Sequence, residues 1–147
     1  MLLLNCAEEL QTALDQTSPG GVDLVAGENL FIDQFTPQPY GNTVVLLNTG
    51  GLEPQPYLSV ANQAPAAYQR ARVQILVYGD PNDTGFSAGE ALARAILGQL
   101  AFATHGSFVA VRAVESQPTY VGPEPETGRH VFSMNLQCEY KATTAGN

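Results

Sequence analysis

Apolar and polar side chains alternate without a break along the stretch from Arg129 to Tyr140. The apolar members are Phe132, Met134, Leu136, Cys138 and Tyr140, and the polar members between them are Ser133, Asn135, Gln137 and Glu139. Successive side chains of a β-strand point to opposite faces of a sheet. The pattern therefore predicts one long strand, in a sheet that has one packed face and one solvated face.

Length and composition indicate a single globular domain. The chain has 147 residues, of which 44% are hydrophobic and 14% are charged. A domain of this size can bury a sizeable core without metals or disulfides. We expect residues 1–147 to form one α+β domain, with a flexible tail at residues 142–147.

The charge balance disfavours specific binding to DNA. The net charge is -8, from 14 acidic and 6 basic residues. No window of the sequence gathers Arg or Lys into a cluster that could neutralise phosphates. The same acidity suits a surface past which nucleic acid slides without sticking, and it suits ordinary solubility equally well.

The two cysteines and the N-terminus show no sign of export. Cys6 and Cys138 are far apart in the sequence, and each lies in an apolar pattern, so we expect both to be reduced core residues. Residues 1–4 lack the features of an export signal. No run approaches the roughly 18 apolar residues of a membrane span, so no contact with a membrane is expected.

The first half of the chain predicts one helix and two weak strands. Leu3, Ala7, Leu10 and Leu14 recur at helical spacing, and the Ser-Pro-Gly-Gly run at 18–21 ends this pattern. Short apolar runs at 30–35 and 43–47 resemble strands. Prolines and the Gly50-Gly51 pair surround them, so we expect edge strands with irregular connections.

The second half is more regular and defines the fold class. It predicts a central strand at 70–78, a helix at 87–104, a strand at 107–117, an excursion at 118–128 and the final strand. The predicted fold is α+β: a mostly antiparallel sheet of four to five strands, with two helices packed on one face.

Ser87 lies in a motif with two interpretations. Residues 85–89 match the G-x-S-x-G nucleophile elbow, and Glu115, Glu124, Glu126 and His130 follow in the order that a catalytic triad would need. The elbow requires a strand that runs straight into the turn, whereas seven residues separate Tyr78 from Phe86. Ser87 and Glu90 also have the spacing of a helix-capping box, and we favour that interpretation.

No other motif predicts a metal or cofactor site. The Asp80 to Gly85 segment resembles half of a calcium loop, but Ala91 stands where the bidentate Glu is needed. His105 and His130 have no Cys, Asp or Glu at a ligand spacing. The glycine pairs lack the phosphate-binding patterns. The sequence predicts no catalytic residue, no cofactor and no metal.

Residues 68–140 carry a resemblance to a known family. The segments YQRARVQILVYGDPNDTGFSAGEALARAILGQL and SFVAVRAVESQPTYVGPEPETGRHVFSMNLQCEY contain a strand ending near an Asp, a helix ending in a Leu-x-x-Leu-like turn, a strand running into Gln-Pro, an acidic loop, and Gly-Arg-His before the last strand. In this order they resemble the tail-terminator or minor-capsid (tail completion) proteins of long-tailed bacteriophages. The resemblance covers about half of the chain.

The resemblance implies a structural protein of the virion. Members of that family form a homo-hexameric ring at the head-proximal end of the tail tube, where the ring stops tube growth and docks the head connector. The implied partners are other copies of the chain, the tail tube protein and the head-tail connector protein, while DNA passes through the lumen without specific binding. The implied location is the tail or neck of the virion, assembled in the bacterial cytoplasm.

Two excursions are the expected contact surfaces. They are Gly79 to Phe86 and Pro118 to Gly128, because long loops in a compact domain are usually functional or disordered. The expected polar contacts are Asp80, Asp83, Glu124, Glu126 and Arg129, with the acidic loop of one subunit meeting Arg129 of its neighbour. Two alternatives remain open: another head-tail connector or tail tube subunit, and a small serine hydrolase using Ser87.

Overall fold

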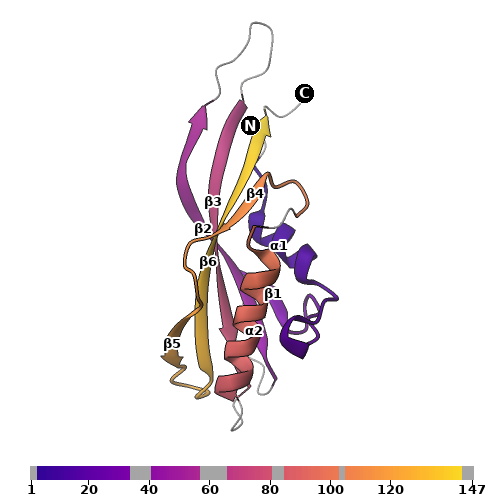
Figure 1. Cartoon of the computed structure of the whole chain (residues 1–147), viewed down its shortest axis with the longest axis vertical. Helices are drawn as coiled ribbons and strands as arrows, with labels where there is room; N and C mark the ends of the chain where they lie inside the picture. Colours follow the sequence, from indigo (N-terminus) through magenta and orange to yellow (C-terminus); the bar gives the residue numbers. More distant parts are fainter. Residues whose placement is uncertain (1–2, 34–40, 57–65, 81–84, 103–104, 144–147) are drawn as a thin grey trace, which may run out of the picture.

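The computed structural model describes residues 3–33, 41–56, 66–80, 85–102 and 105–143 (Figure 1). These residues form an α+β fold with a mostly antiparallel sheet, as the sequence predicts. The helical elements are α1 (Cys6–Leu14), the 3-10 turn η1 (Pro19–Gly21) and α2 (Gly85–Leu100). The strands are β1 (Leu30–Ile32), β2 (Thr43–Pro56), β3 (Ala66–Tyr78), β4 (Ala110–Ala113), β5 (Thr119–Pro123) and β6 (His130–Thr143).

The sheet has six strands in the described residues, one more than the upper limit that the sequence predicts. The order is β1-β2-β3-β6-β4, and β5 also pairs with β6. β1 runs parallel to β2, and all the other pairs are antiparallel. The additional strand is β5, which lies within the segment 118–128 that the sequence predicts as an excursion. The same edge of β6 is therefore shared by β4 and β5, and β3 occupies the other edge.

The strands β3 and β6 form the predicted two-faced ladder. Their register pairs Val73 with Leu136, Ile75 with Met134 and Val77 with Phe132, and all six side chains are buried. The alternation predicted from Arg129 to Tyr140 is confirmed. The strand continues to Thr143, so residues 142 and 143 belong to the sheet and not to a tail.

β2 differs most from its prediction. The sequence predicts a short edge strand at 43–47, whereas β2 runs for 14 residues between β1 and β3. The register shifts between Asn48 and Gly51, which marks a β-bulge. Gly51 has a φ of 129°, and a Cβ there would overlap the Arg70 carbonyl oxygen. The glycines therefore carry the strand through the bulge instead of ending it.

Both helices begin at residues other than those predicted. α1 begins at Cys6 and not at Leu3, which is 63% exposed, because Asn5 caps the helix by accepting a hydrogen bond from the Glu8 amide at 3.2 Å. α2 begins at Gly85, two residues before the predicted start. The predicted end at residue 104 lies outside the described residues, and α2 ends at Leu100.

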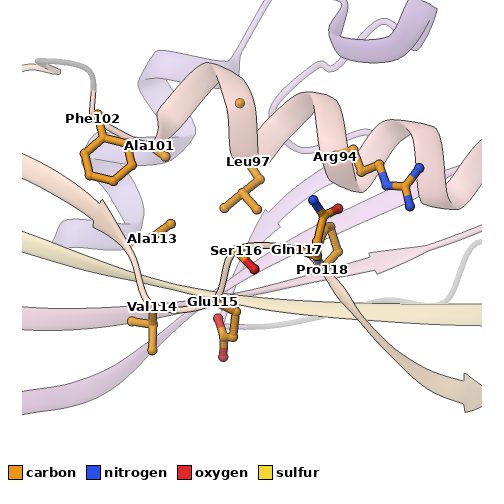
Figure 2. Close-up of a pocket in the computed structure, with 11 residues that line it drawn as sticks. Arg94, Leu97, Ala101, Phe102, Ala113, Val114, Glu115, Ser116, Gln117 and Pro118 are labelled. Carbon is orange, nitrogen blue, oxygen red and sulfur yellow. The ribbon is translucent and has the colours of Figure 1, made fainter.

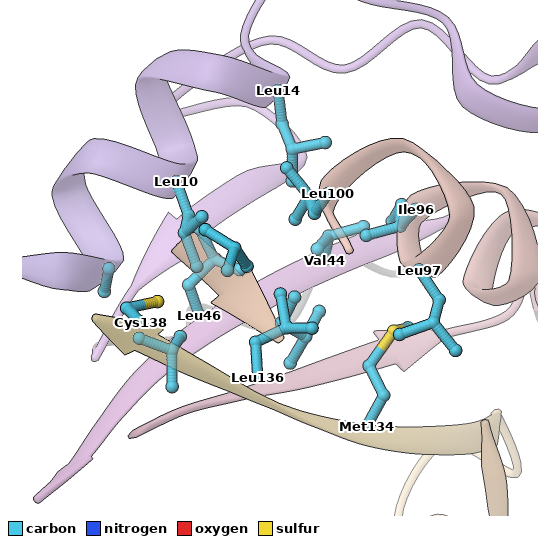
Figure 3. Packing of buried hydrophobic residues seen from close by; sticks show 14 of the residues in the cluster. Leu10, Leu14, Val44, Leu46, Ile96, Leu97, Leu100, Met134, Leu136 and Cys138 are labelled. Atoms are coloured by element: carbon cyan, nitrogen blue, oxygen red, sulfur yellow. The ribbon is translucent and has the colours of Figure 1, made fainter. Parts of the chain in front are cut away.

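The core lies between the helices and one face of the sheet (Figure 3). The helices contribute leucines and isoleucine at helical spacing: Leu10, Leu14, Leu92, Ile96, Leu97 and Leu100. Cys6 and Cys138 are buried and free in this core, as predicted. A hydrogen bond to Cys6, together with burial, raises the pKa of the Cys138 thiol, so this side chain stays protonated.

We predict that Leu136→Ala lowers the free energy of unfolding by about 2–5 kcal/mol, because the substitution leaves a cavity at a fully buried site. Gln137→Ala is the matched control on the adjacent residue, whose side chain points to the open face. It should change stability by less than about 0.5 kcal/mol. Chemical denaturation followed by circular dichroism measures both values. Equal losses would show that the helix-covered face does not hold the core.

Candidate interaction surface

The two predicted excursions meet at one end of the sheet. β5 and the start of β6 form a hairpin, and the Gly79 amide donates a hydrogen bond to the His130 carbonyl at 2.8 Å. The Phe86 ring, at the start of α2, lies 5.1 Å from the Tyr120 ring and 5.4 Å from the His130 ring. We call the surface formed by Asp80, Phe86, Tyr120, Val121 and the hairpin turn 124–128 the hairpin end. Figure 1 shows the hairpin of β5 and β6 at the lower end of the sheet.

The turn of this hairpin is fixed by Glu124. The Glu124 amide donates to the Arg129 carbonyl at 2.7 Å, and the Gly128 amide donates to the Glu124 carbonyl at 2.8 Å. The Thr127 hydroxyl donates to the Glu124 carboxylate at 2.6 Å. The Glu124 charge also acts on β3: burial of the Tyr78 hydroxyl raises the pKa of Tyr78, and the negative charge of Glu124 raises it further. The segment predicted as a loose excursion is therefore an ordered hairpin.

Arg129 is not at the surface, in contrast to the sequence expectation. Its residue is 1% exposed, and its Nη1 donates a hydrogen bond to the Thr43 hydroxyl at 3.2 Å. A guanidinium that is enclosed in this way joins the starts of β2 and β6 within one subunit. In this structure it does not present a charge to a neighbour, because tertiary packing encloses the side chain that the sequence places beside a turn.

The four predicted acidic contacts differ in their surroundings. The Asp80 carboxylate accepts from the Gly41 amide at 2.8 Å, and the Asp80 amide donates to Asn42 Oδ1 at 3.0 Å, so Asp80 fixes the approach to β2. Glu124 organises the hairpin turn. Glu126 is exposed. Asp83 lies outside the described residues.

Three glycines allow α2 to begin directly against the end of β3. A Cβ at Gly85 would overlap the Asp80 carbonyl oxygen, and one at Gly79 would overlap the Gly85 carbonyl oxygen. A Cβ at Gly89 would lie 3.0 Å from the Phe132 ring and 3.3 Å from the Gly79 Cα. The glycines of the apparent nucleophile elbow therefore serve a close approach of helix and strand.

Ser87 is neither at the cap position nor at an elbow. It is the third residue of α2, and its side chain is exposed. Glu90 forms an ion pair with Arg94 at 3.0 Å, one turn along the helix, so the predicted capping box is not formed. His130 Nδ1 lies 2.7 Å from the Tyr120 hydroxyl, which makes Tyr120 the partner of this histidine. Tyr120 lies in the segment predicted as an excursion, and no motif in the sequence marks it as the partner of His130.

A groove of about 690 Å³ runs between α2 and the segment that joins β4 to β5 (Figure 2). Leu97, Ala101 and Phe102 line one wall, and Ala113 and Val114 line the other. Glu115 is also at this groove, but its carboxylate accepts hydrogen bonds from the amide and side chain of Asn135, at 3.0 and 2.8 Å. This carboxylate therefore binds the edge of β6 at Asn135, between the part of β6 that pairs with β4 and the part that pairs with β5.

The described residues contain neither a cluster of metal ligands nor a membrane-spanning helix. Within them, no three His, Cys, Asp or Glu side chains gather in a way that could hold a metal ion. No helix in the described part of the chain is long and apolar enough to cross a membrane.

Comparisons with known proteins include a distant structural likeness. No protein-family model matches the chain, and no curated protein matches it. A solved structure described as the virion of a native gene transfer agent particle contains a chain with a TM-score of 0.46 and 11% sequence identity. The similarity covers 79% of this chain and 81% of that chain. A likeness at this level carries no argument about function.

We predict that Gly85→Ala lowers the free energy of unfolding by about 1–3 kcal/mol or more, because the added methyl group overlaps backbone. Gly98→Ala is the matched control in the same helix, where a Cβ meets nothing within 4 Å. It should raise stability by about 0.5–1 kcal/mol, since alanine favours the helix. Thermal and chemical denaturation of the two variants measures both changes in the free energy of unfolding. Similar effects of both substitutions would contradict the close approach of α2 to β3.

We predict that Ser87→Ala changes stability by less than about 0.5 kcal/mol, because the exposed side chain is not at the cap position. A cap residue would instead lose about 1 kcal/mol. Denaturation curves measure this difference. Hydrolysis of ester substrates should be equally absent from the wild type and the variant. Esterase activity that disappears with Ser87 would restore the hydrolase alternative.

Proposed function

We propose that the chain is a structural protein of a phage-type virion, and more specifically a tail terminator without enzymatic activity. In this role it forms a homo-hexameric ring at the head-proximal end of the tail tube. The ring stops tube growth and provides the interface on which the head docks. The proposal is based on the family resemblance of residues 68–140, and the geometry of the hairpin end supports it.

The observation that carries the proposal is the meeting of two remote segments at the hairpin end. Both were expected from the sequence to contact other proteins, and the structure brings them to one surface. That surface exposes apolar side chains beside its acidic ones: Phe86, Tyr120 and Val121 are 40%, 42% and 63% exposed. Exposed apolar residues within a polar rim are typical of a protein-protein contact.

The sheet edges suit a head-to-tail ring. One edge is formed by β1 and the distal part of β2, and the other is formed by β4 and β5. The two edges differ in sequence and shape, so contacts between unlike surfaces of neighbouring subunits would be heterologous. Heterologous contacts close into rings when the rotation between neighbours permits. The hairpin end, which lies at the end of the strands, would then remain available on the rim of the ring.

The proposed partners follow from this arrangement. They are the tail tube protein, the head-tail connector protein and further copies of the chain. DNA would pass through the lumen without specific contacts, in keeping with the net charge of -8. The proposed location is the neck of the virion, after assembly in the bacterial cytoplasm. Asp80, Glu124 and Glu126 are the proposed polar contacts at the hairpin end, along with Asp83 from outside the described residues.

We predict that Val121→Lys disturbs the junction of tail and head, because it puts a charge into the apolar part of the hairpin end. Leu3→Lys is the matched control: Leu3 is 63% exposed, as is Val121, and it lies before α1, outside the strands that form the edges of the sheet. Electron micrographs of particles assembled with each variant measure tail length and attachment to heads.

Tails of excess or irregular length with Val121→Lys, and normal tails with Leu3→Lys, are the expected result. Tails of normal length that fail to join heads would favour the connector alternative. Normal tails joined to heads with both variants would rule out the hairpin end as the assembly surface.

A further inference from the structure

Two hydrogen bonds hold the start of α1 on the sheet, one on each side of Cys6. The Leu4 amide donates to the Tyr140 hydroxyl at 3.2 Å, and the Ala7 amide donates to Asn48 Oδ1 at 3.1 Å. Cys6 is the first residue of α1 and lies between these two contacts in the chain. The position of Cys6 over the sheet is therefore fixed from both sides.

The residue beneath Cys6 is Cys138 of β6. The register across β3 places Asn48 in line with Leu136, so α1 contacts the sheet at the level of Leu136 and through the side chain of Tyr140. Cys138 lies between these two residues on the same face of β6. Figure 3 shows its side chain beside the first turn of α1. The Cys138 thiol donates a hydrogen bond to Cys6, so two cysteines that are far apart in the sequence are neighbours in the core.

The two thiols differ in reactivity. Cys6 accepts this hydrogen bond at the N-terminus of α1, where the helix dipole also favours a negative charge. The hydrogen bond from Cys138 lowers the pKa of Cys6, against the opposing effects of burial and of the Glu9 charge. The same hydrogen bond, together with burial, raises the pKa of Cys138. Cys6 is therefore the better nucleophile, and Cys138 is the thiol that stays protonated until it is needed.

We propose that Cys6 and Cys138 form a redox-sensitive pair, which a small-molecule disulfide such as oxidised glutathione converts into an intramolecular disulfide. The Cys6 thiolate attacks one sulfur of the oxidant, the S–S bond of the oxidant breaks, and one glutathione leaves and takes up a proton. Cys138 then gives up its proton and attacks the Cys6 sulfur, which releases the second glutathione. The two protein thiols lose two electrons, and the oxidant is reduced to two thiols.

Access to Cys6 requires a small opening of the chain. Cys6 is 2% exposed, but Leu3 ahead of it is 63% exposed, and Leu4 is held on β6 by its hydrogen bond to Tyr140. Chain ends with few buried contacts open locally at low free-energy cost. Release of residues 3–5 uncovers the start of α1 without separating the strands. The rate of oxidation should therefore follow the strength of this hydrogen bond.

The disulfide joins α1 to the interior strand β6 and closes a loop from residue 6 to residue 138. A cross-link of this span stabilises a domain by restricting its unfolded chain. The helix is then fixed on the sheet by a covalent bond wherever the surroundings are oxidising. Cys138 pairs with Val111 of β4, whereas β5 pairs nearer the start of β6, so the two cysteines lie away from the hairpin end. The inference is independent of the proposed assembly role.

Mass spectrometry of the full chain tests the pairing. Folded wild type is incubated with oxidised glutathione, freed of oxidant at acid pH, and labelled with N-ethylmaleimide in denaturant. It should lose two hydrogen atoms and take up no maleimide, and a peptide map should link Cys6 to Cys138 within one chain. Cys138→Ala should keep one glutathione on Cys6, because no second thiol displaces it. Cys6→Ala should remain unmodified.

Melting curves followed by circular dichroism give a second readout. Oxidation should raise the melting temperature of the wild type by about 10 °C, and a reductant should reverse this shift. Neither alanine variant should show it. If an alanine variant does not fold, the peptide map and the reversible shift of the wild type decide. Two free thiols after prolonged oxidation of the folded protein, a disulfide between two chains, or a lasting glutathione adduct on the wild type would each overturn the inference.

The route of access has its own test. Tyr140→Phe removes the acceptor of the Leu4 amide and should speed oxidation about fivefold, because the chain end opens more readily. Tyr120→Phe is the matched control, since it removes a hydroxyl at the hairpin end, and it should oxidise at the wild-type rate. Equal rates for the two variants would overturn the proposed opening of residues 3–5.

Discussion

The antiparallel pairing of β3 with β6 is the constraint on which the rest of the structure depends. The two strands pair residue for residue from Ala66 and Thr143 to Tyr78 and Val131 without a register shift. A slip of one residue would move Leu136 and Met134 from the core to solvent, so the buried face fixes this register. β2 attaches to the outer edge of β3, and β4 and β5 attach to the outer edge of β6. Both helices pack on the face that the ladder presents to them. The position of every functional candidate follows from this one pairing.

The elements with strong periodicity could be predicted from the sequence, and those that depend on tertiary contacts could not. The alternation around Leu136 and the strand containing Val73 were clear, because both lie in the interior of the sheet. β2 was underestimated because Gly50 and Gly51 are strand-ending residues in most contexts, and only pairing with β3 through a bulge keeps the strand continuous. β5 was missed because four of its five residues are exposed, so no buried face marks it in the sequence. The helix starts were misjudged by two or three residues, because the apolar spacing extends to Leu3, before the Asn5 cap of α1, and because Gly85 acts through its close approach to Asp80.

The sequence indicated the two segments of the candidate surface, but it did not indicate how their side chains are arranged in space. Loop length and composition singled out the segments near Asp80 and Glu124 as candidates, and the fold brings them to one end. The cluster of Phe86, Tyr120 and His130 had no signal, because its members are far apart in the sequence and aromatic residues occur in any core. Arg129 was expected at the surface since a basic residue beside a turn is usually solvated, yet the starts of β2 and β6 enclose it.

The place of β6 in the sheet has a consequence for how the chain folds during synthesis. β6 follows the other described strands in the sequence and is also an interior strand, and β4 and β5 have no other strand to pair with in the described structure. Until residue 143 has left the ribosome, the nascent chain can assemble only β1, β2 and β3, with α1 and α2 over an incomplete face. Folding that depends on contacts of long sequence separation is slow and leaves apolar surface exposed in the meantime. Subunits should therefore become competent for assembly only once β6 has emerged from the ribosome, and a chain interrupted before β6 would be recognised by chaperones and proteases as unfolded.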